Sequence, residues 1–163
     1  MPIVPFETLP DSSRVWTFGS DRALDAEQEK LLLRGVDEYL EGWKAHGAPL
    51  TVGREWRDGR FLAVAVDQSD TGATGCSIDG LFRVLQQLES TTGANLVGGG
   101  RVFYRDGHAG VRCVARAEVA ALASSGAITP DTVVFDTTLT DLGSWRGNFE
   151  QPARKGWVGD LLA

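Results

Sequence analysis

The residue types best suited to chemistry gather in one stretch, residues 64–79, which has the sequence VAVDQSDTGATGCSID. Its apolar start predicts a strand, its glycine-containing middle predicts a loop, and its end begins an amphipathic pattern that predicts a helix. The first backbone N–H groups of a helix have no partner within the helix and carry partial positive charge. The junction is therefore typical of a site that binds an anion or favours a thiolate.

Cys76 falls at or beside the start of this expected helix. A helix N-terminus favours the thiolate, the nucleophilic form of the thiol, so Cys76 is the candidate catalytic residue. A nucleophilic cysteine normally needs a histidine, and the two histidines, His46 and His108, are expected at a helix end and in a turn. The alternative is structural: Thr74 or Ser77 caps the helix, and Cys76 packs inward as a small apolar residue.

A ligand-binding interpretation of the same junction requires no nucleophile. Backbone N–H groups and hydroxyls at the helix start would hold an anion, and arginines from two expected hairpins would add positive charge if the hairpins lie side by side. The alternative is that these arginines are solvated and protect strand edges. The residues expected to bind the ligand are Asp67, Thr74, Gly75, Ser77, Asp79, Arg60 and Arg101.

Metal and cofactor motifs are absent from the sequence. The carboxylates around the loop do not have the spacing of a calcium-binding loop, so no metal site is expected. The glycine run 98–100 matches neither the GxxxxGK[ST] phosphate loop nor the GxGxxG dinucleotide fingerprint. No cofactor is expected.

Composition narrows the class of protein. The chain has 163 residues, 42% of them hydrophobic, and a net charge of −6, which indicates one globular domain over residues 1–163 and argues against broad nucleic-acid binding. Two cysteines form no disulfide framework and indicate a reducing compartment. The N-terminus does not look like a signal peptide, and no apolar run is long enough to span a membrane. These features predict a cytoplasmic protein without nucleic-acid or membrane partners.

The periodic segments predict two long helices and several hairpins. Asp25 is a good N-cap for a first helix that Gly47 would end, and Gly93 would end a second helix that contains an apolar stripe over 78–88. Asp58-Gly59 predicts a tight hairpin whose second strand, 60–66, is apolar enough to be buried on both faces.

The C-terminal half predicts a second hairpin and a poorly patterned tail. The elements expected there are strands over 101–104 and 111–114, a short helix over 117–125 and a strand over 132–135. Residues 1–13 are expected to be an extended lead-in. The arm 137–163 holds three large aromatic residues, which would pack on its own domain or on a second copy in a homodimer.

This order of elements predicts an α+β fold. It is related to the ferredoxin-like βαββαβ sandwich, with an extra strand, a short helix and a C-terminal strand and arm. The helices are expected mainly on one face of a single antiparallel or mixed sheet.

Three motifs together resemble a family of small bacterial proteins that are often labelled "ABC transporter ATPase". They are Asp67-Gln-Ser-x-x-Gly72-x-x-Gly75-Cys76-Ser77-Ile78-Asp79, Arg14-Val-Trp16 and Pro152-x-x-x-x-Trp157. The label conflicts with the residues, because the chain has no Walker A loop. The resemblance implies that the Gly-Cys-Ser-Ile-Asp segment is a family hallmark and assigns no activity.

The sequence leaves open whether the protein is an enzyme. The function expected from it is a domain that binds a small molecule, an anion or a protein through the 67–79 junction. The alternative is a thiol-dependent enzyme or redox-responsive protein with Cys76 as the reactive group.

Overall fold

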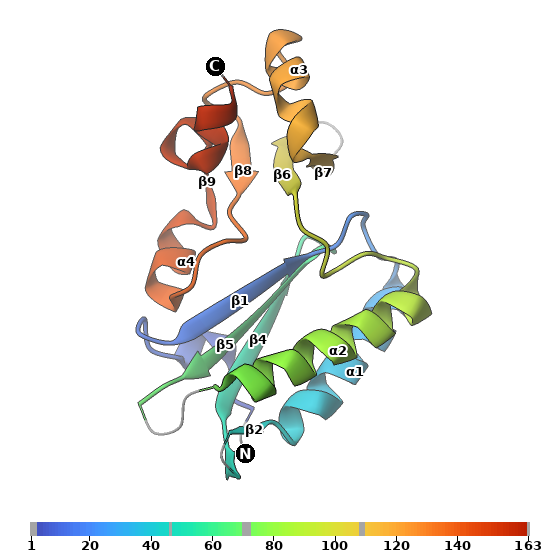
Figure 1. Cartoon of the computed structure of the whole chain (residues 1–163), viewed down its shortest axis with the longest axis vertical. Helices are drawn as coiled ribbons and strands as arrows, with labels where there is room; N and C mark the ends of the chain where they lie inside the picture. The colour runs from blue at the N-terminus through green and yellow to red at the C-terminus, as the bar shows by residue number, and fades with distance from the viewer. Residues whose placement is uncertain (1–2, 46, 70–72, 108–109, 163) are drawn as a thin grey trace.

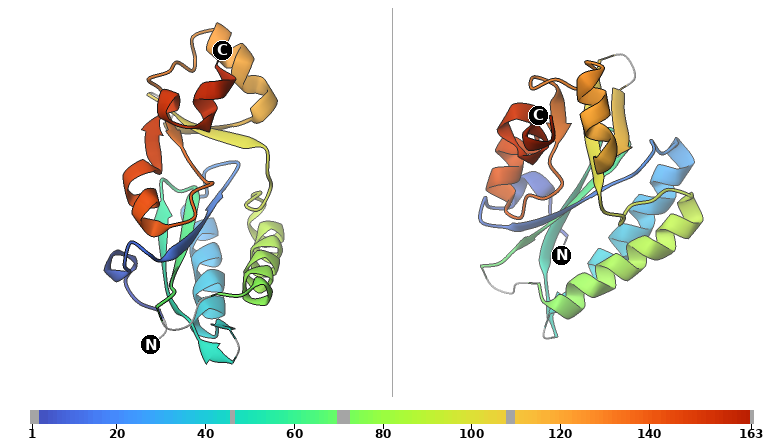
Figure 2. Two further views of the ribbon diagram at one scale, coloured as in Figure 1. Left: turned by 60° about the vertical axis from the view of Figure 1, so that its left-hand side comes forward. Right: turned by 45° about the horizontal axis from the view of Figure 1, so that its top comes forward.

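Two antiparallel sheets face each other in the computed structural model, which describes residues 3–45, 47–69, 73–107 and 110–162. Two long helices cover the outer face of the first sheet, and short helical segments cover the outer face of the second (Figures 1 and 2). The expected α+β class is confirmed.

The first sheet has the strand order β1-β5-β4 and carries the helices on one face. Its strands are β1 (Arg14–Gly19), β4 (Thr51–Arg57) and β5 (Phe61–Asp67), all antiparallel. The helices α1 (Ala26–Glu41) and α2 (Gly75–Thr92) lie side by side against it, as expected for the helix positions (Figure 2).

Strand β5 is the centre of the molecule because both of its faces are buried. Leu62, Val64 and Val66 lie on the face that packs against the helices. Phe61, Ala63 and Ala65 lie on the opposite face, which packs toward the second sheet. The tight turn predicted from Asp58-Gly59 is confirmed in the hairpin between β4 and β5. Asp58 and Gly59 have φ angles of 57° and 66°, the positive values that a type I′ turn requires.

The second sheet has the order β7-β6-β8-β9, and it is where the expected single sheet is wrong. Its strands are β6 (Arg101–Asp106), β7 (Gly110–Ala115), β8 (Val133–Phe135) and β9 (Glu150–Pro152). A ferredoxin-like fold would place β6 in the same sheet as β1. Here β6 pairs with β7 and β8 instead, and Phe103 and Phe135 from this sheet pack on Phe61 with ring centroids 5.1 and 4.7 Å apart.

The outer face of the second sheet carries its own small core. It is covered by η2 (Arg116–Glu118), α3 (Val119–Ser124), η3 (Ala153–Lys155) and η4 (Trp157–Leu161). Val119, Ile128 and Val158 are buried in this core. The core between the two sheets is separate from this one and contains larger aromatic residues, among them Phe61, Phe103 and Phe135.

Helix α1 begins as expected and ends earlier than expected. Asp25 and Gln28 form a reciprocal capping box, which satisfies two backbone donors at the helix start. The helix ends at Glu41 with Gly42 as its C-cap, and Gly47 lies instead in a short hairpin between β2 (Lys44–Ala45) and β3 (Ala48–Pro49). Gly93 ends α2 in the left-handed conformation, as expected.

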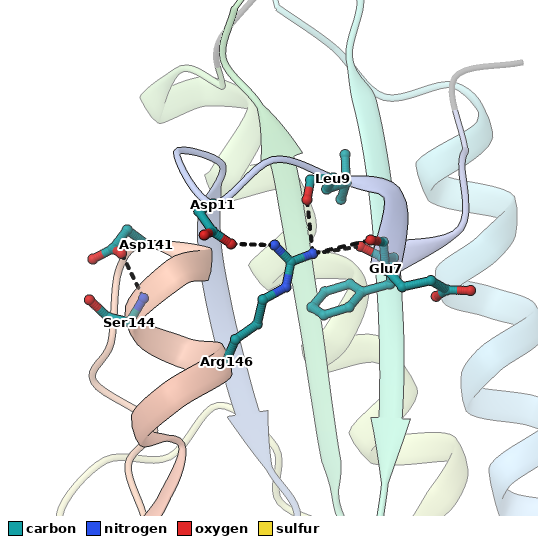
Figure 3. A network of polar contacts seen from close by, with 7 residues as sticks. Glu7, Leu9, Asp11, Asp141, Ser144 and Arg146 are labelled. Atoms are coloured by element: carbon teal, nitrogen blue, oxygen red, sulfur yellow. Dashed lines mark hydrogen bonds and ion pairs between the residues drawn. The ribbon is translucent and has the colours of Figure 1, made fainter.

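The lead-in and the C-terminal arm are fastened to each other. Arg146 of α4 (Leu142–Asn148) reaches across to η1 (Phe6–Thr8) and its flanks, and donates to the Asp11 carboxylate at 2.6 Å and the Leu9 carbonyl at 2.8 Å (Figure 3). The arm's Trp145 and Phe149 are buried between the sheets. The arm therefore packs on its own domain.

Candidate ligand-binding site

The start of α2, the site expected from sequence, is closed by its own side chains. Thr74 and Ser77 form a capping box: Thr74 Oγ1 accepts from the Ser77 N–H at 3.2 Å, and Ser77 Oγ accepts from the Thr74 N–H at 2.7 Å. Ser77 is only 6% exposed. The two hydroxyls thus bind the backbone of the cap and not an outside ligand.

The same first turn is anchored to the end of α1. Trp43 Nε1 donates to the Ser77 carbonyl at 2.8 Å, and the Tyr39 hydroxyl donates to the same oxygen at 3.3 Å. A Cβ at Gly80 would lie 2.1 Å from the Tyr39 oxygen, so a larger residue there would displace the Tyr39 hydroxyl. Burial raises the pKa of Tyr39. We call this region, formed by Tyr39, Trp43, Thr74, Ser77 and Gly80, the helix seam.

Of the two acidic residues of the predicted site, Asp67 has a local structural role. Asp67 ends β5, and its carboxylate accepts from the Ser69 N–H at 2.9 Å and hydroxyl at 2.8 Å, which lowers its pKa. Asp79 is exposed on α2. Gly75 is the first residue of α2, and the side chain of Cys76 lies outside the described part of the chain, so Cys76 is placed only by its backbone in the first turn of α2.

Arg60 and Arg101 do not lie at the start of α2, so the prediction that they bind a ligand together with Thr74 and Ser77 is wrong. Arg60 precedes β5 and Asp67 ends it, a separation of about 23 Å at roughly 3.3 Å per residue. The Arg60 guanidinium donates to the Ser20 carbonyl at 3.2 Å, and Arg101 donates to the carbonyls of Asn95 and Gly98, both at 2.9 Å. Both arginines brace backbone at the far end of the sheet.

Cys113 of β7 lies beside these two arginines. Burial raises the pKa of its thiol, and the positive charges of Arg101 and Arg60 only partly oppose this. The thiol is consequently kept in its less reactive form. The remaining hairpin arginines are paired with carboxylates, as in Arg54 with Asp37 at 2.9 Å and Arg112 with Asp106 at 2.6 Å. They form no open basic patch.

A hollow of about 480 Å³ lies between the two sheets, at a place the sequence analysis did not single out. Residues of β1 and of the segments 96–101 and 137–140 line it. Figure 1 shows that the chain runs from α2 through the first segment to β6, and from β8 through the second segment to α4. The hollow's volume is typical of small-molecule sites. We call it the inter-sheet hollow.

Aromatic and cationic side chains line the inter-sheet hollow. Its apolar walls are formed by Trp16, Phe18, Phe82, Leu96, Phe103 and Trp157. Arg116 is exposed at its edge, with the guanidinium carbon 5.4 Å from the Trp157 ring centre. No acidic side chain among the described residues lines it, although the whole chain carries 22 acidic and 16 basic residues.

Two residues that line the hollow carry a buried polar atom without a partner. Thr17 Oγ1 on β1 and Arg101 Nε are both shielded from solvent and have no hydrogen-bond partner among the described residues. A buried hydroxyl left unpaired is unfavourable, and such groups are uncommon. In the sequence, this region is marked only by residues without a helix or strand pattern before β6 and after β8, and by Trp16 and Trp157.

The described residues contain no group of three or more histidine, cysteine, aspartate or glutamate side chains that could hold a metal ion. Within the same part of the chain, no helix is both long and apolar enough to cross a membrane. Comparison of the chain with protein-family models, curated proteins and solved structures finds no match.

Proposed function

We propose that the protein is a binding domain and that the inter-sheet hollow takes a ligand with an apolar body and an anionic group. This keeps the function class expected from the sequence and moves the site away from the 67–79 junction. The proposal depends on the charge of the hollow: although the chain is acidic, no carboxylate among the described residues lines this apolar space, and Arg116 lies at its edge.

Two features support binding at this place. Apolar walls exclude water and bury the ligand body, while a few polar groups orient it. Arg116 has no ion-pair partner among the described residues, so its guanidinium is available to a carboxylate, sulfonate or phosphate. The helix seam has a hollow of its own beside Lys44 and Arg83, but its hydroxyls and its Ser77 carbonyl are already bonded.

The test uses two dyes of similar shape, anilinonaphthalene sulfonate and the uncharged phenylnaphthylamine. Both should bind the folded protein and quench Trp16 and Trp157. Arg116→Gln should weaken the sulfonate by about fivefold and leave the neutral dye unchanged, because an exposed ion pair contributes up to about 1 kcal/mol. The matched control is Arg83→Gln at the helix seam, which should change neither dye.

Two results would overturn the proposal. One is a folded protein that binds neither dye. The other is a sulfonate affinity that falls with Arg83→Gln and is unchanged by Arg116→Gln, which would return the site to the start of α2.

The second candidate function is a thiol-dependent enzyme or redox-responsive protein with Cys76 as the reactive group. It is favoured by one observation, the position of the Cys76 backbone in the first turn of the 18-residue helix α2. Alkylation of the folded protein by iodoacetamide across pH tests it. This candidate predicts that Cys76 reacts well below the ordinary thiol pKa; reaction only at that pKa, or only after unfolding, would remove it.

Location, assembly and family remain proposals as well. A cytoplasmic location and membership of the small bacterial family suggested by the Gly-Cys-Ser-Ile-Asp segment rest on the sequence alone. A homodimer would have to use a surface other than the arm's Trp145 and Phe149, because these side chains are buried within their own chain.

A further inference from the structure

The outer edge of β1 has unused pairing capacity inside the inter-sheet hollow. Along its inner edge, β1 pairs with β5 from Arg14 to Gly19. Along its outer edge, only the start of β1 is paired: Val15 N–H donates to the Thr140 carbonyl at 2.9 Å, and Arg14 forms a bridge with Asp141. Beyond this point the 137–140 segment leaves β1 for the second sheet.

The direction of the free backbone groups follows from the alternation of a strand. The Val15 N–H points away from β5, and in an antiparallel ladder every second residue points the same way. The N–H and C=O groups of Thr17 and Gly19 therefore also point outward, and both residues line the hollow. Among the described residues, these groups have no hydrogen-bond partner.

We propose that the ligand of the hollow is a short extended peptide that adds to β1 as a further strand. Its backbone pairs with Thr17 and Gly19, and its carboxylate lies toward Arg116. This inference rests on the proposed function, because it names the class of ligand for the same hollow. Strand addition obtains affinity from main-chain hydrogen bonds and specificity from the pockets that receive alternate side chains.

The walls define the side chains that such a peptide would carry. A strand added to the first sheet points successive side chains to opposite faces. On the helix side they would meet Phe82 and Leu96, and on the side of the second sheet they would meet Phe103 and Leu139. Because both sides are apolar, the favoured peptide has consecutive apolar or β-branched residues.

A peptide fits this edge better than a second copy of the chain does. The free part of β1 is enclosed by the 96–101 and 137–140 segments and faces the second sheet. A single strand can enter such a space, whereas the β1 edge of another copy is enclosed in the same way and could not reach it. The chain's own Thr140 and Asp141 already begin the ladder that the peptide would continue.

The experiment measures displacement of anilinonaphthalene sulfonate from the full chain by the pentapeptide acetyl-Thr-Val-Thr-Val-Ile with a free carboxylate. Three matched competitors are the same peptide with a C-terminal amide, and the peptide N-methylated at one set of alternate residues or at the other set. We expect the free peptide to displace the dye, the amide to bind severalfold more weakly, and one of the two methylated peptides to bind at least tenfold more weakly. Such a loss would show that the peptide's own N–H groups donate to β1.

Thr17→Pro supplies the complementary variant. Proline is tolerated on an edge strand where the missing N–H points away from the ladder, so the β1–β5 pairing should survive. The variant should keep the circular dichroism spectrum of the folded parent and lose the peptide in direct titration calorimetry. If this variant does not fold, the methylated peptides still decide the question.

The inference is overturned if the dye binds and the pentapeptide does not displace it, or if both methylated peptides compete as well as the parent. It is also overturned if the free chain sediments as a dimer that Thr17→Pro abolishes, since the edge would then serve a second copy. These results differ from failure of the proposed function, in which neither dye binds.

Discussion

The helix seam and the inter-sheet hollow differ in how they use their polar groups. At the seam, the hydroxyls of Thr74 and Ser77 and the Ser77 carbonyl all have partners, and Trp43 is 2% exposed. In the hollow, the Thr17 hydroxyl and the outer edge of β1 have none among the described residues. A region whose polar groups bond to each other stabilises the fold, whereas a region with unpaired groups is suited to bind something else.

This difference predicts opposite responses to substitution. Changes at the seam should reduce the free energy of unfolding and leave dye binding intact. Changes in the hollow should alter binding with little loss of stability, the pattern often seen when a binding site is not optimised for stability.

The largest effect is expected for Trp43→Ala. Trp43 packs in the core between the helices and the first sheet and donates to the Ser77 carbonyl, so its removal should lower the free energy of unfolding by about 3–5 kcal/mol. Urea denaturation measures the loss. The matched control is Trp157→Ala in the hollow, which should cost less stability and weaken anilinonaphthalene sulfonate. A Trp43→Ala protein of unchanged stability but altered dye affinity would reverse the comparison.

An intermediate effect is expected for Ser77→Ala. The change removes the acceptor for the Thr74 N–H and should lower the free energy of unfolding by about 1–2 kcal/mol, since Ser77 is buried. Ser124→Ala on α3 is the control, because its exposed hydroxyl should matter by no more than about 0.5 kcal/mol. Equal stability of the two variants would mean that the capping box is not important for the seam.

The features that the sequence predicts correctly depend on residues that are close together in the chain. The Asp25 capping box, the Asp58-Gly59 turn and the Gly93 helix end depend on residues within four positions of each other, and all are confirmed. Next to the early end of α1 lies a more distant contact, the bond from Trp43 to Ser77 in α2, which the local pattern of residues 26–47 does not contain.

The sheet arrangement and the hollow depend on contacts far apart in the chain. The sequence shows that β5 is buried on both faces, but not that Phe103 and Phe135 from a second sheet cover one of them. In the same way, Gly98 to Arg101 and Thr137 to Thr140 have no common pattern, and only the fold places them at two ends of one hollow.

A small effect of the opposite sign is expected for Thr17→Val. Valine has the same shape and removes a hydroxyl that is buried without a partner, so the variant should be neutral or more stable by up to about 1 kcal/mol. Urea denaturation beside the Ser77→Ala protein makes the comparison direct, because each change removes one buried hydroxyl. A loss of more than about 1 kcal/mol would show that Thr17 does have a partner in the folded chain.

The smallest effect concerns the pH dependence of two exposed carboxylates, one beside each region. Ser69 donors lower the pKa of Asp67 near the seam, and Ser144 donors lower that of Asp141, which caps α4 beside the Thr140 contact with β1. A lowered folded-state pKa contributes stability that is fully present above the ordinary value of 3.8 and is lost as the pH falls through the folded value. Asp67→Ala and Asp141→Ala should therefore be destabilised relative to the parent at pH 6, and the difference should shrink toward pH 2 in urea denaturation.

Peptide binding separates the two variants. Only Asp141→Ala should also weaken binding of the pentapeptide, because the Thr140 and Asp141 pairing begins the ladder that the peptide continues. If instead Asp67→Ala alone affected the peptide, the edge of β1 would not be where it binds.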